Sequence, residues 1–177
     1  CVARREPKSL PGPATIVRFT TVIRVHPFPA LRPIASRAAE VACEPYDVVT
    51  TAEARALADG RPASFLRVVR SEIELDPSID PHSTPVYEHA RRKLGEFCDQ
   101  GILLRDDAPS FYVYRLSVVG RRQAGLVACM DVEDYRSGRI RIHEKTRPDK
   151  EDDRVRHILT TRTHAEPVLL AARGADA

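Results

Sequence analysis

The chain contains no tryptophan, and aromatic residues make up only 6% of its 177 positions. Platforms on which nucleic-acid bases could stack are therefore not prominent. An excess of charge of one sign is also missing, since 28 lysines and arginines stand against 25 aspartates and glutamates. Proteins that bind nucleic acid usually carry a basic patch or stripe, so this balance argues against nucleic acid as a partner.

Several sequence motifs are absent as well. None of the four cysteines forms a Cys-x-x-Cys pair, which argues against a zinc ribbon or a thioredoxin-type site. We expect each cysteine to be a small buried apolar group of an intracellular protein. There is no Walker loop, no glycine-rich dinucleotide fingerprint and no His-Glu-x-x-His zinc motif. The sequence thus predicts no resident metal.

Long apolar runs are absent too. No run approaches the roughly 18 residues that a membrane span requires. The first residues, "CVARREPKSLPGPATIVRF", show no apolar core of a signal peptide. We therefore expect a cytoplasmic protein that does not enter a membrane.

What is present is the composition of a globular protein, with 42% hydrophobic and 30% charged residues. Residues 1–14 are rich in proline and basic side chains and predict a flexible lead. The length of the remainder suits one domain, over residues 15–177.

Hydrophobic spacing predicts a mixture of helices and strands. The clearest helix is capped by Thr84 and ends at Gly101, with apolar residues at helical spacing between them. Further helices are predicted near 35–43, 50–60, 131–138 and 148–160, and strands at 15–25, 63–75, 102–106, 166–173 and in a hairpin at 111–130 that turns at 120–122. The order is irregular and shows no repeated βαβ unit. We predict an α+β fold with a mixed, mainly antiparallel sheet and a few packed helices.

The densest group of charges lies in "RIHEKTRPDKEDDR", Arg141–Arg154. Alternation from Arg139 to Lys145 predicts an extended segment with its polar residues on one face. The segment ends just before a helix, whose free N–H groups favour an anion. We predict that His143 and Glu144 are catalytic, with Glu144 a base or a ligand of substrate-bound magnesium. The predicted phosphate-binding residues are Arg141, Lys145, Thr146 and Arg147.

The same run also has a purely structural interpretation. Acidic residues open the helix at 148–160 and basic residues follow, which is the order that the helix dipole favours. Four carboxylates in the first two turns also repel an anion unless a cation lies between them. The charged helix can therefore be an ordinary solvated face, and both interpretations remain open at this point.

Six segments resemble one known family in sequence and in order. They are "PFPALRP" (27–33), "PYDVV" (45–49), "SFLRVVRSEIEL" (64–75), "VYEHAR" (86–91), "PSFYVYRL" (109–116) and "HEKTRPDKEDDR" (143–154). Together they resemble the bacterial and archaeal family called domain of unknown function DUF 1015, over about residues 23–171.

The resemblance implies more than the residues do. The family is similar to free-serine kinases of the ParB and sulfiredoxin-like superfamily, which implies that fold and a nucleotide-dependent phosphotransferase acting on a small hydroxyl substrate such as serine. ATP or ADP with Mg²⁺ would be its cofactor. In this interpretation Tyr46 binds substrate and Asp47 joins His143 and Glu144 as a catalytic residue.

The resemblance also leaves alternatives open. Full-length members are about twice as long and carry an Asp-Gly-His-His-Arg stretch that is absent here. We therefore expect this chain to correspond to the front half of such a protein. A non-catalytic module that binds a nucleotide or a protein, and an inactive truncated remnant, are the other two interpretations.

Overall fold

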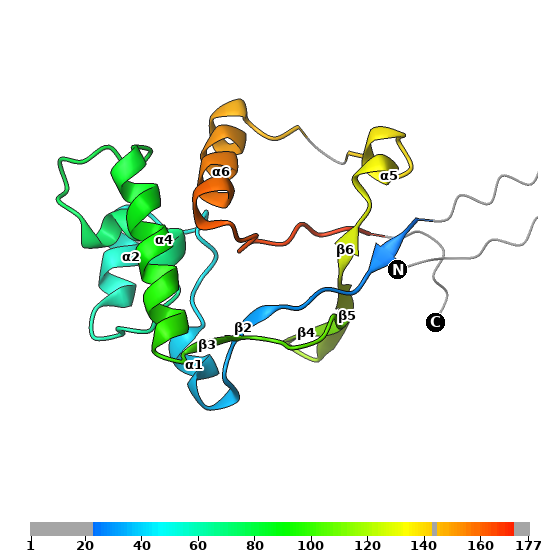
Figure 1. Ribbon diagram of the computed structural model, residues 1–177, viewed down its shortest axis with the longest axis horizontal. Coiled ribbons are helices and arrows are strands. Elements are labelled where there is room, and N and C mark those ends of the chain that lie inside the picture. The colour runs from blue at the N-terminus through cyan, green and yellow to red at the C-terminus, as the bar shows by residue number, and fades with distance from the viewer. Residues whose placement is uncertain (1–22, 143–144, 172–177) are drawn as a thin grey trace, which may run out of the picture. The chain divides into compact units, whose positions relative to one another are not determined.

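The computed structural model describes residues 23–142 and 145–171 of the chain (Figure 1). Contacts among these residues form two compact units. Unit 1 contains the described residues of 23–29, 108–142 and 167–171, and unit 2 contains 30–107 and 145–166. The predicted flexible lead at 1–14 lies outside the described residues, and the prediction of a single domain over 15–177 stays a prediction.

Unit 2 is mainly helical. Its two strands, β2 (Leu31–Pro33) and β3 (Leu103–Arg105), pair antiparallel with Leu31 opposite Arg105. Its helices are η1 (Ala35–Arg37), α1 (Ala38–Val41), α2 (Thr51–Ala58), α3 (Leu66–Val69), η2 (Ser71–Glu74), α4 (Thr84–Asp99) and α6 (Pro148–Thr161). Helix α4 packs against α3 and against α6, and Figure 1 labels both α4 and α6.

The two best-defined helices of unit 2 follow from local sequence. Thr50 caps α2 in a capping box, because its hydroxyl accepts from the N–H of Glu53 while the Glu53 carboxylate accepts from the N–H of Thr50. Pro85 lies in the first turn of α4, where its missing N–H costs nothing. The predicted cap Thr84 is instead the first helical residue, one position after the cap Ser83. Both predicted helices are confirmed.

Two apolar clusters form the core of unit 2. One joins α1, α3, α4 and β3 through Val41, Ala63, Val68, Leu94, Phe97, Ile102 and Leu103. The other lies between α2, α3 and η2 and contains Ala54, Ala58, Leu66, Val69 and Ile73. Helix α3 contributes to both clusters, so this single helical turn connects the two halves of the core.

Unit 1 contains two small antiparallel pairs and one helix. Strand β1 (Val25–His26) pairs with β6 (Cys129–Met130), and β4 (Tyr112–Val118) pairs with β5 (Arg121–Val127). The short helix α5 (Val132–Arg136) follows β6. The Phe28 backbone bonds to Ser110, and the Tyr112 hydroxyl donates to the Phe28 carbonyl at 3.1 Å, which ties the start of β4 to the segment after β1.

A buried carboxylate fastens α5 to the rest of unit 1. Asp134 has 0% of its surface exposed. It accepts from the backbone N–H of Arg24 at 2.7 Å and from two nitrogens of Arg139 at 2.7 and 2.6 Å. These hydrogen bonds lower the pKa of Asp134, the Arg24 bond most strongly, and keep the carboxylate charged. Such a group is stable inside a protein only when it is paired in this way.

The predicted α+β class is confirmed, with a different sheet arrangement from the one expected. In the described residues every strand pairing is antiparallel, but the strands form three two-stranded pairs and no larger sheet. The predicted strand at 15–25 lies mostly outside the described residues. No helix in the described ranges is long and apolar enough to cross a bilayer.

The predicted strand at 63–75 is wrong, because these residues form α3 and η2. Its β-branched residues favour a strand, but Leu66, Val69 and Ile73 also recur at helical spacing and are buried together. Arg67 fixes the helical form, since its guanidinium donates to the carbonyls of Ala58 and Arg61. Tertiary contacts therefore outweigh the local preference.

Four smaller predictions are also corrected. The extended segment from Arg139 to Lys145 is not a strand in its described part, because Arg139 and Ile140 bend back so that the Ile140 N–H bonds to the Asp134 carbonyl. Residues 166–171 form no strand. The hairpin turns at Val119 and Gly120, one residue earlier than predicted. Cys129 is exposed and Cys43 and Cys98 are half-buried, so the expectation of buried cysteines fails for these three.

We expect Leu66→Ala to lower the free energy of unfolding by about 2–5 kcal/mol, because Leu66 is completely buried in the second cluster. The matched control is Leu159→Ala on α6, where 61% of the leucine surface is exposed. Urea denaturation followed by circular dichroism measures both variants. Equal losses in the two would contradict the placement of Leu66 in the core.

Candidate functional site

The face of α6 that turns inward in unit 2 is polar. Asp153, His157 and Thr161 are its buried residues and stand four positions apart. The His157 imidazole Nε2 lies 3.1 Å from the Val68 carbonyl oxygen, and the Thr161 hydroxyl donates to the His157 carbonyl at 2.8 Å. Burial lowers the pKa of His157, so the neutral imidazole is favoured, and its Nε2–H donates to Val68. Helix α6 is thus held by hydrogen bonds where most helices use an apolar stripe.

Asp153 accepts hydrogen bonds from three side chains, and only 8% of its surface is exposed. The Tyr87 hydroxyl donates to Oδ1 at 2.8 Å, and the His82 Nδ1 lies 2.9 Å from the same oxygen. Oδ2 accepts from Arg154, with the shorter distance 2.6 Å. Burial alone raises the pKa of Asp153, but these hydrogen bonds outweigh it and lower the pKa to about 2. The carboxylate is therefore charged at neutral pH.

Arg154 connects this carboxylate to two further groups. Its Nη1 donates to both oxygens of Glu166 at 3.2 Å, and its guanidinium carbon lies 4.1 Å from the centroid of the Tyr46 ring. A guanidinium at this distance over an aromatic face is held by a cation–π interaction. We call Tyr46, Asp153, Arg154 and Glu166 the Arg154 cluster.

Arg70 fixes the turn that carries Tyr46. Its Nη1 donates to the Tyr46 carbonyl at 3.1 Å, and its Nη2 donates to the Thr51 hydroxyl at 2.9 Å. Glu72 pairs with Arg70 at 2.9 Å, which keeps the guanidinium in place. The turn is closed by the Val48 N–H, which donates to the Pro45 carbonyl at 3.3 Å. The start of α2 and the end of α3 thus position the Tyr46 ring.

Two groups of the Arg154 cluster, the Glu166 carboxyl and the Tyr46 hydroxyl, have raised pKa values. Burial raises the pKa of the Glu166 carboxyl, the charges of Asp47 and Asp153 raise it further, and Arg154 opposes the change. Burial also raises the pKa of the Tyr46 hydroxyl, and Glu166 adds to this. A carboxyl group with a raised pKa is a better proton acceptor than a free one, which is the property required of a general base.

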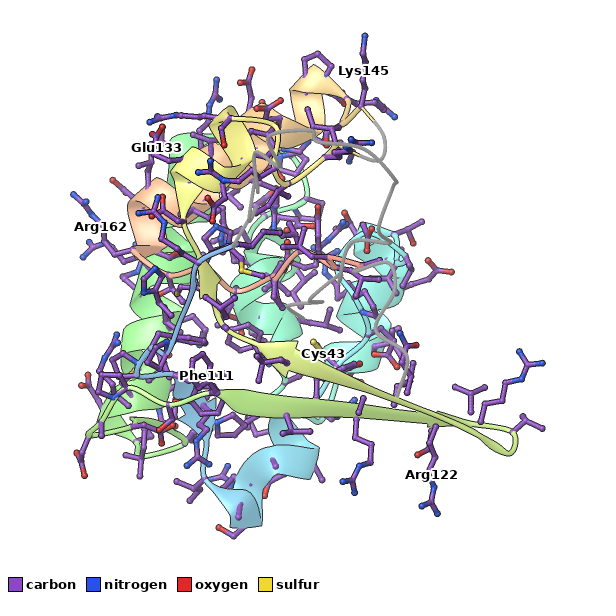
Figure 2. All side chains as sticks on the ribbon, turned by 90° about the vertical axis from the view of Figure 1, so that its right-hand side faces the viewer. Cys43, Phe111, Arg122, Glu133, Lys145 and Arg162 are labelled. Atoms are coloured by element: carbon purple, nitrogen blue, oxygen red, sulfur yellow. The ribbon has the colours of Figure 1, made fainter. Side chains whose placement is uncertain are left out.

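The predicted site residues lie in different places. Tyr46 belongs to the Arg154 cluster, and Asp47 lies beside it, exposed, with its charge felt by Glu166. Lys145, Thr146 and Arg147 are exposed before α6. The Lys145 side chain extends away from the ribbon (Figure 2), and Arg147 pairs with Asp149 at 2.7 Å.

The structure does not place the remaining predicted site residues at the Arg154 cluster. Arg141 is exposed and belongs to unit 1, and His143 and Glu144 lie outside the described residues. Their predicted catalytic and phosphate-binding roles stay predictions. Within the described ranges, no group of three or more histidine, cysteine, aspartate or glutamate side chains is arranged to hold a metal ion.

Sequence reasoning missed five participants: His82, Tyr87, Asp153, Arg154 and Glu166. The signal was partly available, because the spacing of Asp153, His157 and Thr161 places polar residues on the one face of α6 that can be buried. The partners His82, Tyr87 and Glu166 come from other segments, and no local pattern marks them.

A family model described as "Protein of unknown function (DUF1015)" matches residues 25–177. This match covers most of the chain. The chain belongs to the DUF1015 family. No curated protein and no solved structure matches it. The DUF1015 match includes both the turn that carries Tyr46 and the helix that carries Arg154.

We expect Asp153 to make this DUF1015 protein lose stability in acid. Its pKa in the folded protein is about 2, below the value of about 3.9 in an unfolded chain. The stabilisation is therefore complete above about pH 4 and is lost as the pH falls toward 2, by about 1–2 kcal/mol. Urea midpoints measured across this range should fall less steeply in Asp153→Asn than in the wild type.

The matched control for this experiment is Asp152→Asn, because Asp152 is the exposed neighbour on the same helix. It should keep the wild-type dependence on pH. If Asp153→Asn and Asp152→Asn gave the same curve, Asp153 would not be the charged group that the geometry indicates.

Proposed function

We propose that the chain is part of a cytoplasmic, nucleotide-dependent phosphotransferase that acts on a small hydroxyl compound such as free serine. The observation that carries the proposal is the contact between Tyr46 and Arg154 at 4.1 Å. It brings together two segments that the sequence singles out, the Pro45-Tyr46-Asp47 turn and the charged run that ends at Arg154. A contact between them supports their belonging to one site.

The Arg154 cluster supplies a proposed base and a proposed contact for the substrate. Glu166, with its raised pKa, is the proposed base that accepts the proton of the substrate hydroxyl. Tyr46 is the proposed substrate contact, since its ring forms one wall of the cluster. The substrate oxygen then forms a bond to the terminal phosphorus of the nucleotide as the bond to the nucleoside phosphate breaks. Positioning and charge, with little covalent chemistry, are what such a transfer requires.

The donor side of the site is proposed from the sequence. Lys145, Thr146 and Arg147, with Arg141, are the proposed phosphate contacts, and His143 and Glu144 are proposed to assist the transfer. Mg²⁺ bound to a nucleotide usually needs only one or two protein carboxylates besides the phosphates. Asp47 fits that requirement, because its exposed carboxylate lies beside the Arg154 cluster and leaves Glu166 free to act as the base.

Isothermal titration of the chain with ATP and with ADP, each with Mg²⁺, tests this function. We expect one of the two nucleotides to bind, and Lys145→Ala and Arg147→Ala to weaken binding because each removes a positive charge from the phosphate site. Arg156→Ala, which removes an exposed arginine from the same helix, is the control and should bind as the wild type does. Absence of binding by the wild type to either nucleotide would remove the proposal.

We expect Glu166→Gln to slow phosphate transfer to serine by about 10²–10⁴-fold without preventing nucleotide binding, because it removes the proposed base and keeps the side-chain shape. Transfer is measured with a nucleotide labelled in its terminal phosphate. Nucleotide binding without transfer by the wild type would point to a regulatory module. An unchanged rate in Glu166→Gln would refute only the role of Glu166 as the base and would leave the proposed phosphate transfer standing.

A further inference from the structure

The β4–β5 ribbon of unit 1 presents apolar side chains to solvent. Among the described residues its two strands pair only with each other. A two-stranded ribbon is marginally stable in water by itself. Seven large apolar residues on or next to the ribbon are nevertheless exposed: Phe111, Val113, Tyr114, Leu116, Val118, Val119 and Leu126. Exposed apolar residues gathered in this way mark interaction sites more often than ordinary surface.

Three of these apolar residues share one face of the ribbon, and Val113 and Leu126 pair on the other. Tyr114, Leu116 and Val118 alternate along β4 and therefore share a face. Opposite them on β5 stand Gly125, Gln123 and Arg121. A shallow hollow of about 450 Å³ lies against this end of the ribbon, and its lining consists of Leu116, Val118, Val119, Arg121, Arg122 and Gln123.

The turn of the ribbon contains a residue that the turn itself disfavours. Val119 and Gly120 both have positive φ, 31° and 75°. A two-residue turn with this geometry favours Asn-Gly, and a β-branched residue in the left-handed region is strained. The Val119 side chain is 99% exposed, so packing inside the protein does not offset the cost of this strained backbone conformation. Strain of this kind is a reason to look for a function.

The charge of the ribbon has one sign. Between Ala108 and Met130 the sequence contains three arginines and neither aspartate nor glutamate. Arg115, Arg121 and Arg122 are all exposed. The Arg122 side chain extends away from the strand near the turn (Figure 2). The ribbon is thus an apolar strip bordered by positive charge, which is complementary to an apolar segment that carries carboxylates.

We propose that the β4–β5 ribbon is a docking surface for an extended segment of a partner protein in which apolar and acidic residues alternate. A strand has this alternation on its two faces, and strand addition to an existing ribbon is a common way to recognise a peptide. Apolar residues along the whole ribbon fit a protein partner better than nucleic acid, which needs polar contacts. A lipid surface would take up only the turn, and a second copy of the ribbon would bring like charges together.

The test uses the whole chain and a fluorescent ten-residue peptide of alternating glutamate and valine. Binding is measured by fluorescence anisotropy. The control peptides replace glutamate by lysine or valine by serine, and neither should bind. We expect Val119→Asn to weaken binding roughly tenfold, because it removes one apolar contact worth about 1.4 kcal/mol, while thermal unfolding stays at or above the wild-type temperature because Asn-Gly suits the turn.

Charge is tested by Arg122→Glu, with Arg136→Glu on α5 as the control for an equal charge change in the same unit. The first should abolish peptide binding and the second should leave it intact. The proposal is overturned if the wild type does not bind the glutamate–valine peptide, or if Val119→Asn binds it as the wild type does. It is equally overturned if mixed-sequence DNA or anionic phosphatidylserine vesicles bind the ribbon more tightly than the peptide, or if Val119→Asn abolishes self-association of the chain.

Discussion

The charged carboxylate of Asp153 is the interaction on which the organisation of unit 2 depends. It lies on the buried face of a helix that has no apolar stripe, and it remains charged because Tyr87, His82 and Arg154 donate to it. Breaking a buried pair of this kind by removing one partner is far more costly than losing a surface ion pair. The same carboxylate aligns Arg154, and Arg154 in turn contacts Tyr46 and Glu166. Fold and candidate site therefore share one set of hydrogen bonds.

Much of the helical framework could be predicted from the sequence. Helices α2 and α4 begin and end at residues whose capping and turn chemistry is local, and the buried stripe of α4 has unmistakable helical spacing. The segment at 63–75 could not be assigned in the same way, because its β-branched residues satisfy two periodicities. The half-buried Arg67, which donates to the carbonyls of Arg61 and Ala58, and the shared burial of Leu66, Val69 and Ile73 decide between them. Local patterns predict the secondary structure where one periodicity dominates. They fail where contacts with other segments decide between helix and strand.

The candidate site also contains residues that could be predicted from local sequence and residues that could not. Tyr46 could be singled out from its turn, but its partner Arg154 was concealed within a run of charges that also has a simple structural explanation. Glu166 follows the end of α6 and bears no motif, and only its contact with Arg154 and its raised pKa mark it. A group that gains its character from burial and from distant neighbours leaves no trace in its immediate sequence. That is why the carboxylates of this site were harder to find than its aromatic ring.

The hydrogen bonds of the buried Asp134 carboxylate have a consequence for the order in which the protein folds. Its carboxylate holds the backbone of Arg24, 110 positions earlier in the chain. By contrast, α2, α3 and η2 pack on one another within residues 51–74. On a ribosome these helices can associate as soon as they emerge, whereas the first strand must wait until α5 has been synthesised. The first strand of unit 1 thus stays without its partner while these three helices of unit 2 are already packed.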